Sequence, residues 1–271
     1  MPELPEVETT KRGLEGLVVG RQIRACQVRN GKLRSEVPVN IGELLRNVEI
    51  LSLTRRAKYL LLNTSNGSLL VHLGMSGSWR VVSQDSPPNK HDHVDIELDN
   101  GSILRYRDPR RFGLILWAGQ QALQHPLLNK LGPEPLQDSF DADYLYRVSR
   151  KRKTSIKQLL MDSQVVAGIG NIYANEALFM SAIRPGRRAS SLTRAACKDL
   201  CKAIKQVLQR AIEAGGSSLR DFTKADGNPG YFQQQLLVYG REGEKCSKCG
   251  SVIKSKRIGQ RSSFYCPHCQ H

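Results

Sequence analysis

The alternation of apolar and polar residues changes twice along the chain, and each change predicts a different secondary structure. Residues 5–18 predict an amphipathic helix with acidic side chains near its start and one apolar stripe of Val7, Leu14, Leu17 and Val18. From about residue 20 to residue 118, apolar and polar residues alternate in short runs, which is typical of strands. Beyond residue 150 the helical period returns and predicts three helices, over 154–166, 171–183 and 192–214.

The strand region contains two clear hairpins. Residues 50–77 predict one that turns at Ser65–Gly67, and residues 93–108 predict another around an Asp-Asn-Gly turn. Helical segments of roughly 10–15 residues would have to alternate with the strands in a parallel sheet, and this region contains none. We therefore expect an antiparallel sandwich or barrel.

The remaining signals concern boundaries. The proline-rich residues 126–140 are expected to form a linker, and residues 236–242 a strand that enters the cysteine-rich tail. Ser190 or Ser191 is expected to cap the third helix, and Gly215–Gly216 to end it. The fold class is therefore α+β, with an N-terminal antiparallel β-sandwich, a helical domain and a C-terminal four-cysteine module. The expected limits are 1–131 for the sandwich, 132–150 for the linker, 151–235 for the helical domain and 236–271 for the module.

Charge is unevenly distributed between the two halves. The chain of 271 residues has 41 Lys and Arg against 25 Asp and Glu, a net charge of +16. Residues 1–150 hold 20 basic and 17 acidic side chains, and residues 151–271 hold 21 and 8, so the net charges are +3 and +13. A basic half of this kind attracts polyanions, and nucleic acid is the first expectation. An anionic membrane surface or a merely well-solvated surface is the alternative.

Four of the seven cysteines form two C-x-x-C pairs near the C-terminus. Cys246, Cys249, Cys266 and Cys269 have the spacing C-x2-C-x16-C-x2-C, which lets two tight turns present four thiolates to one tetrahedral Zn²⁺. Because all four ligands are cysteines, no position is left for water, and the predicted zinc is structural. Basic side chains in this segment favour a finger that binds nucleic acid, with a purely structural ribbon as the alternative: Lys254, Lys256, Arg257 and Arg261.

The chain begins MPELPEVE, a poor start for regular structure because proline donates no main-chain hydrogen bond. It does not have the pattern of a signal peptide, and no apolar run approaches the roughly 18 residues of a membrane span, so we expect the cytoplasm. If Met1 is removed, the first group is the secondary amine of Pro2. An α-amine has a reference pKa of about 7.7–8.0, so a useful fraction is neutral near pH 7 and can act as a nucleophile.

Seven short segments and the four-cysteine module follow one another in a fixed order: MPELPEVE, RRAKYL, HLGMSGS, KHDHV, DPRRFG, LGPEPL and GIGNIYANE. Together they resemble the bacterial formamidopyrimidine-DNA glycosylases, which repair 8-oxoguanine, and the resemblance spans nearly the whole chain. It implies a base-flipping enzyme with glycosylase and AP-lyase activities. It also implies a helix–two-turn–helix motif in the helical domain and a zinc finger after it.

The resemblance implies that Pro2 is the nucleophile, which attacks C1′ of the damaged nucleotide and forms a Schiff base. Glu3 takes the role of the acid at the opening sugar. Lys58, which the local pattern places within a strand, becomes the proton donor for β-elimination and a phosphate contact. Arg261 becomes its counterpart for δ-elimination. Glu6, one helical turn beyond Glu3, is expected to anchor the helix start or the active-site network.

The same resemblance implies a set of DNA contacts. Met75, Arg110 and Phe112 would fill the space left by the flipped base, and the Arg110 guanidinium can pair with the orphaned cytosine. Backbone contacts are expected from His91, Lys153 and Asn171, and Asn171 is also expected to cap a helix. A core position for Phe112 and a capping-only role for Asn171 are the alternatives. The loop 226–231 would cover the lesion.

Two other functions remain open from the sequence. The sister endonuclease VIII family shares the N-terminal proline but prefers oxidised pyrimidines and usually begins PEGPE, whereas this chain reads PELPE. A zinc-ribbon protein that binds DNA without catalysis would explain the basic half but not the N-terminal Pro-Glu. We expect a monomer that acts on damaged double-stranded DNA in the bacterial cytoplasm, in association with the nucleoid.

Overall fold

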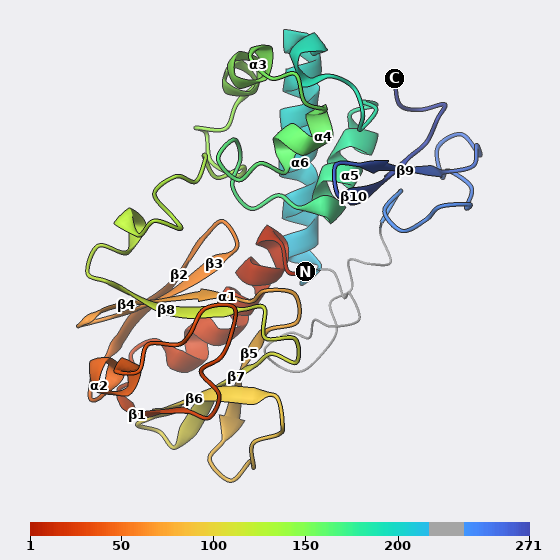
Figure 1. The fold of residues 1–271 in the computed structure, drawn as a ribbon. Coiled ribbons are helices and arrows are strands. Elements are labelled where there is room, and N and C mark those ends of the chain that lie inside the picture. Colours follow the sequence, from red (N-terminus) through yellow and green to blue (C-terminus); the bar gives the residue numbers. More distant parts are fainter. Residues whose placement is uncertain (217–235) are drawn as a thin grey trace. The chain divides into compact units, whose positions relative to one another are not determined.

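The computed structural model describes residues 1–216 and 236–271 and divides them into two compact units. The first unit comprises residues 1–129 and 214–216 of the described chain, and the second comprises 130–213 and 236–271. Each unit has its own secondary structure and its own apolar core (Figure 1).

The first unit contains two four-stranded sheets in which every neighbouring pair is antiparallel. One sheet has the order β1 (Ile23–Val28), β6 (Asp92–Leu98), β7 (Ser102–Arg107) and β5 (Ser78–Ser83). The other has the order β2 (Ile50–Arg56), β3 (Tyr59–Thr64), β4 (Gly67–His72) and β8 (Leu114–Gly119). The expected antiparallel β-sandwich is confirmed, and both predicted turns lie where expected, between β3 and β4 and between β6 and β7.

Helix α1 (Leu4–Val18) completes the core of the first unit. It lies against β2 and β3 of one sheet and β5 of the other (Figure 1). Val7, Leu14 and Val18 are buried in a cluster with residues of both sheets, as the helical stripe predicts. Leu17 is 49% exposed, so its assignment to the buried stripe is wrong. Two short helices that we did not predict, α2 (Ile41–Leu45) and η1 (Ala122–Gln124), complete the unit.

The second unit packs helices around α6 (Arg194–Glu213), which contacts α3 (Ala142–Arg150) and α5 (Asn171–Met180). Two short elements, α4 (Ile156–Leu160) and η2 (Ala189–Ser191), connect these helices. The two-stranded hairpin β9 (Lys254–Ile258) and β10 (Arg261–Tyr265) packs on α5. Gly215 and Gly216 follow α6 with φ of +78° and +80°, so the predicted glycine stop is confirmed.

Several boundaries in the second unit differ from the sequence-based expectation. Helix α5 ends at Met180 rather than at residue 183, and α3 lies within the segment 132–150 expected to be a linker. The helix predicted over 154–166 is α4, which ends at Leu160. Beyond it the chain turns, because Asp162 Oδ1 accepts the Gln164 N–H and the Asp162 carbonyl oxygen accepts the Val165 N–H. The cap of α6 is Thr193, whose hydroxyl accepts the Ala196 N–H at 3.1 Å, while Ser190 and Ser191 belong to η2. Residues 236–242 form no strand, because the main-chain N–H groups of residues 237–239 bind a side chain instead.

In the described part of the chain, we find no helix with both the length and the apolar character needed to cross a bilayer.

Candidate functional site

The N-terminus enters α1 through buried residues. Pro2 is buried, and Glu3 and Glu6 each expose only 2% of their surface. The Glu6 carboxylate accepts a hydrogen bond of 2.8 Å from the Glu3 main-chain N–H, and the Glu6 carbonyl accepts one of 2.9 Å from the Thr10 hydroxyl. Negative charge at the N-terminal end of a helix is favoured by the helix dipole. Glu6 therefore anchors the first turn of α1 and fixes the direction in which Pro2 and Glu3 leave it.

A chain of contacts joins α1 to the turn that carries Lys58. Arg55 Nε donates to Glu8 Oε2 at 2.8 Å, and Arg55 Nη1 donates to the Ala57 carbonyl at 3.0 Å. Burial opposes ionisation of the Glu8 carboxyl, but the hydrogen bond and the charge of Arg55 outweigh it, so that the pKa of Glu8 is lowered. Arg55 thus connects the helix that begins at Pro2 with the residues next to Lys58.

Lys58 lies in a tight turn, not within a strand as its local pattern suggests. Arg56 pairs with Tyr59, so Ala57 and Lys58 form the two-residue connection between β2 and β3. Ala57 has φ of +53°, a left-handed conformation that a non-glycine residue adopts only where the turn imposes it. The one long alternating run of the sequence is therefore two strands, and the turn presents Lys58 at the end of the sheet.

His72, at the end of β4, is a neighbour of Lys58 to which the sequence gives no role. Burial lowers the pKa of His72, and together with the positive charges of Lys58 and Arg34 it brings the pKa to about 4. The imidazole is therefore neutral at pH 7, and its Nδ1 accepts the Gly74 N–H at 2.9 Å. The only signal in the sequence is the position of His72 at the start of the segment HLGMSGS.

Asp108 organises the loop that follows β7. It is fully buried, and its Oδ1 accepts the Ser76 hydroxyl at 2.7 Å while its Oδ2 accepts the Gly113 N–H at 2.8 Å. The Tyr106 hydroxyl donates to Oδ2 at 3.3 Å; burial and the charge of Asp108 together raise the pKa of Tyr106. One buried carboxylate therefore binds the segment around Ser76 to both ends of the loop 108–113. Sequence reasoning did not assign it a role.

The structure brings the segment around Met75 against the loop that carries Arg110 and Phe112. Gly74, with φ of +65°, packs so closely on the second loop that a Cβ there would lie 2.4 Å from the Phe112 carbonyl carbon. The Arg110 N–H donates to the Ser76 hydroxyl at 3.3 Å, and the Arg110 guanidinium lies 4.9 Å from the centre of the Phe112 ring. Phe112 is 45% exposed, so the core position considered for it is wrong.

The two histidines of KHDH have different environments. His93 is buried on β6, and its Nε2 hydrogen-bonds the Asp108 carbonyl at 2.9 Å, which makes it part of the support for the loop. His91 is half-buried in the turn before β6. Among the described residues, no metal-ligand cluster includes either histidine.

In the second unit, Lys153 is exposed between α3 and α4. Asn171 is the first residue of α5 rather than its cap, because Gly170 is the N-cap residue, with extended φ and ψ of −129° and −156°. The buried Oδ1 of Asn171 finds no hydrogen-bond partner within residues 1–216 and 236–271. Gly168, with φ of +85°, allows a tight turn before the helix. The loop 226–231 lies outside the described residues.

The four cysteine sulfur atoms lie within 4.8 Å of one another, in the arrangement that the spacing predicts. Cys246, Ile253 and Cys266 are buried together with Phe179 of α5, so this small core is made partly of metal ligands. With four thiolates at this separation, the site fits one tetrahedral Zn²⁺ and has no ligand position for water. The zinc is structural, as predicted.

Arg261 is exposed at the first position of β10, opposite Ile258. The next two residues, Ser262 and Ser263, bind Lys157 of α4. The buried Lys157 ammonium donates to the Ser262 carbonyl at 2.7 Å and to the Ser263 hydroxyl at 2.6 Å. Sequence periodicity gives no reason to expect a buried lysine at this position. The hairpin that carries Arg261 is therefore fixed to the helices by a buried cation.

Two consecutive side chains of α5 fix the ends of the cysteine module. The Glu176 carboxylate accepts the main-chain N–H groups of residues 237–239 at 2.8–3.0 Å, and Asn175 Oδ1 accepts the Phe264 N–H at 2.9 Å. Burial raises the pKa of Glu176, although the three N–H donors act in the opposite direction. Neither side chain was singled out from the sequence.

An antiparallel sandwich that presents a buried N-terminal proline, a basic helical unit and a four-cysteine zinc finger together define a DNA-repair glycosylase. Three family descriptions match the chain: "Formamidopyrimidine-DNA glycosylase N-terminal domain" at residues 1–115, "Formamidopyrimidine-DNA glycosylase H2TH domain" at 131–223, and "Zinc finger found in FPG and IleRS" at 243–271. The chain belongs to the formamidopyrimidine-DNA glycosylase family. It is thus a DNA glycosylase with AP-lyase activity that acts on oxidised purines in base-excision repair.

Individual relatives agree over the full length. The chain is 56% identical to the formamidopyrimidine-DNA glycosylase of Thioalkalivibrio sulfidiphilus and 54% identical to that of Klebsiella pneumoniae, with all of both chains covered. Among solved structures, Lactococcus lactis Fpg in complex with DNA containing an abasic site is 35% identical, with a TM-score of 0.92 and 99% of each chain covered. The Thermus thermophilus protein is 38% identical, with a TM-score of 0.89 over 99% of this chain and 98% of that one.

Proposed function

We propose that the chain excises oxidised purines through a Schiff base on Pro2 and then cleaves the strand by β,δ-elimination. The observation that supports this best is the entry of α1. There Pro2 and Glu3 are buried, Glu6 anchors the turn that follows them, and Arg55 connects the same helix to the Lys58 turn.

The first step requires removal of Met1, which converts the Pro2 nitrogen from an amide into a secondary amine. The neutral amine attacks C1′ of the damaged nucleotide, the glycosidic bond breaks, and the base leaves with its electrons. The Pro2 nitrogen then loses its N–H proton, which balances the proton that the departing base takes up. The C1′–O4′ bond then opens, Glu3 protonates O4′, and C1′ becomes the carbon of an iminium ion. The cation is formed directly because a secondary amine has no further proton to lose at nitrogen.

Strand cleavage follows from the acidity that the iminium ion gives to the C2′ hydrogens. Loss of one of them expels the 3′-phosphate, and Lys58 supplies a proton and a phosphate contact for this β-elimination. Loss of the 5′-phosphate in the δ-elimination is assisted by Arg261, as a donor or a phosphate clamp. Hydrolysis finally frees Pro2.

The cluster of Met75, Arg110 and Phe112 fills the space left by the flipped base. An exposed ring on a braced loop can wedge between base pairs, and the neighbouring guanidinium can bond the orphaned cytosine. Base flipping costs a few kcal/mol, roughly, so contacts to the phosphates must hold the kinked duplex. We assign these contacts to His91, Lys153 and Asn171.

We further propose a division into a sandwich at 1–131, a helix–two-turn–helix domain that ends at 235 and a zinc finger at 236–271. The segment 132–150, expected as a linker, contains α3, which contacts α6 and belongs to the helical unit. The proposed setting is that of a monomer in the bacterial cytoplasm, in association with the nucleoid. The net charge of +16 supports this last point, because a basic protein is attracted to DNA.

Borohydride trapping tests the Schiff base. The protein is incubated with a duplex containing 8-oxoguanine opposite cytosine, reduced, and examined by intact mass and by peptide mapping. We expect one covalent adduct on Pro2 and a much lower yield with a Pro2→Gly variant, which still binds the duplex but replaces the secondary amine with a primary one. The Pro5→Ala variant, which alters the second proline of the same segment, serves as the control and should form the adduct.

Tight, salt-sensitive binding without an adduct would leave a DNA-binding protein and overturn the proposal. If an adduct formed only with a duplex that contains an oxidised pyrimidine, the substrate preference would be that of the endonuclease VIII family.

A further inference from the structure

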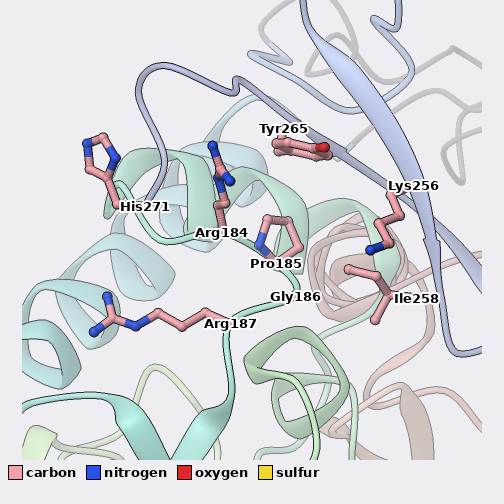
Figure 2. A pocket seen from close by; sticks show the side chains of 8 residues that line it. All are labelled: Arg184, Pro185, Gly186, Arg187, Lys256, Ile258, Tyr265 and His271. Carbon is pink, nitrogen blue, oxygen red and sulfur yellow. The ribbon is translucent and has the colours of Figure 1, made fainter.

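A pocket of about 410 Å³ lies in the second unit, where the loop after α5 meets the hairpin of the zinc finger (Figure 2). Its walls come from residues 184–187, from β9 and β10, and from His271. Its volume lies in the range that small-molecule sites occupy, roughly 300–1,000 Å³. None of the residues used in the proposed excision chemistry lines it.

One part of the wall is apolar and includes an aromatic ring. Pro185 is buried, and Ile258 and Tyr265 are half-buried around the same space (Figure 2). Gly186 keeps the floor open, because a Cβ there would meet only the Ile258 Cδ1 atom, at 3.6 Å. Flat aromatic and aliphatic surfaces of this kind suit a planar ring, and stacking of a base on an aromatic side chain contributes roughly 1–3 kcal/mol.

The other part of the wall is cationic. Arg184 donates from Nε to the Gln270 carbonyl and from Nη2 to the Pro267 carbonyl, both at 2.9 Å. Arg187 is held in the same way by the hydroxyl and the carbonyl of Ser191, at 3.3 and 3.4 Å. Each guanidinium has five N–H donors and uses two of them in these bonds, so both are oriented and keep donors for a ligand.

Lys256 adds a third cation from β9, and Figure 2 shows its side chain beside Ile258 and facing Pro185. None of the eight lining residues, all within the described part of the chain, has an acidic side chain. The main-chain oxygen of His271 accepts the Arg184 N–H at 3.0 Å. The pocket therefore combines one flat apolar surface with three cations and is complementary to a small planar anion.

We propose that this pocket binds a nucleotide, with the base against Tyr265 and Pro185 and the phosphate between Arg184 and Lys256 (Figure 2). Both a free nucleotide and an unpaired nucleotide at the end of a DNA strand have this chemistry. An acidic peptide would satisfy the cations but not the ring. Since the pocket shares no residue with the excision site, the binding is a separate activity and does not depend on the proposed function.

The test follows the Ile258 methyl group by NMR in the whole zinc-containing protein labelled at isoleucine methyls. Titration with adenosine monophosphate should shift the Ile258 signal, and adenosine or inorganic phosphate alone should each bind about tenfold more weakly, because each makes only half of the contacts. Lys256→Ala should weaken binding of the monophosphate about tenfold. Gly186→Leu, which fills the space and keeps every charge, should abolish it.

Arg257→Ala is the matched control, because it removes one positive charge from the same strand without altering the lining. It should bind the monophosphate as the parent protein does. A 5′-phosphorylated trinucleotide separates the two sources: tighter binding than the monophosphate at Ile258 indicates a strand end, and weaker binding indicates a free nucleotide.

The proposal fails if about 10 mM monophosphate leaves the Ile258 signal unshifted, or if Arg257→Ala weakens binding as much as Lys256→Ala. It also fails if only an acidic hexapeptide shifts the signal. The Gly186→Leu variant should still form the borohydride adduct, so failure at the pocket and failure of the excision chemistry are read independently.

Discussion

Both units use a buried carboxylate to hold a loop that carries functional residues, yet the two carboxylates lie beside cores of very different size. In the first unit, Asp108 binds the loop that presents Arg110 and Phe112. In the second, Glu176 binds residues 237–239, the entry to the zinc finger. The Asp108 loop lies against a core that extends over two sheets and α1, whereas the Glu176 contacts adjoin a cluster of five buried residues.

The difference shows what each region depends on. Two of the five buried residues beside Glu176 are zinc ligands, Cys246 and Cys266, so apolar burial alone cannot make this module stable. Metal coordination and buried hydrogen bonds from α4 and α5 replace the missing core. A buried carboxylate that accepts several hydrogen bonds is therefore one of many stabilising contacts in the sandwich. In the zinc finger the same kind of contact is one of the main ones.

Removal of zinc should have the largest effect and should separate the two regions completely. Structural zinc in small fingers contributes on the order of 10 kcal/mol, so chelation should unfold the module and leave the sandwich intact. Hydrogen exchange measured by mass spectrometry should show loss of protection over 244–271 and unchanged protection over β2, β3 and β4. Equal loss in the sandwich would contradict the separation drawn here.

Asp108→Ala should destabilise the first unit by about 3 kcal/mol, because it leaves the Ser76 hydroxyl and the Gly113 N–H buried without an acceptor. Urea unfolding monitored by the fluorescence of Trp79 and Trp117, which both lie in the first unit, measures this loss. Asp85→Ala, at an exposed position of the same unit, should change the free energy of unfolding by less than about 0.5 kcal/mol. A similar loss for both variants would argue against the role assigned to Asp108.

Glu176→Ala should cost about 2 kcal/mol, and the loss should be confined to the second unit. Exchange protection of residues 237–239 should fall before that of any strand in the sandwich. Glu176→Gln retains one acceptor oxygen and should lie between the variant and the parent. Glu213→Ala, at an exposed position, is the control. If the exchange protection of residues 237–239 is unchanged in Glu176→Ala, the metal alone holds these residues in place.

The smallest effect, when taken over a single pH unit, concerns the pH dependence of the first unit. The pKa of His72 is lowered to about 4 when folded, so the unfolded chain binds the extra proton first. Its contribution to stability is complete above the unfolded value of about 6.5 and is lost as pH falls towards 4, by at most about 1.4 kcal/mol per pH unit. His72→Asn should flatten this slope in urea titrations, whereas the exposed His268→Asn should not.

The sequence predicts what is locally encoded. Helix α1, the hairpin turns and the four cysteine ligands follow from spacing within short segments, and each lies where expected. The supports of the site do not. Three buried charged side chains form hydrogen bonds with another loop or element of the fold: Asp108, Glu176 and Lys157. The periodicity of the sequence does not indicate that a charged residue is buried. The Lys58 turn was hidden because strands on both sides continue the same alternation.

The site residues illustrate the same limit. A resemblance in order and motif points to Met75, Arg110 and Phe112, but only the structure brings the two loops together and shows which atoms hold them. The pocket beside Tyr265 could not be predicted at all, because its lining comes from segments about 70 residues apart that no motif connects.

The close approach at Gly74 has a consequence for how this protein can vary. A side chain of any size at that position would collide with the main chain of Phe112, and φ of +65° penalises it further. In a library randomised at both 74 and 75 and selected for repair of oxidised DNA, position 74 should return glycine codons alone. Its half-buried neighbour Met75 should return several unbranched side chains. Of these two adjacent positions, only position 75 is therefore open to substitution in evolution.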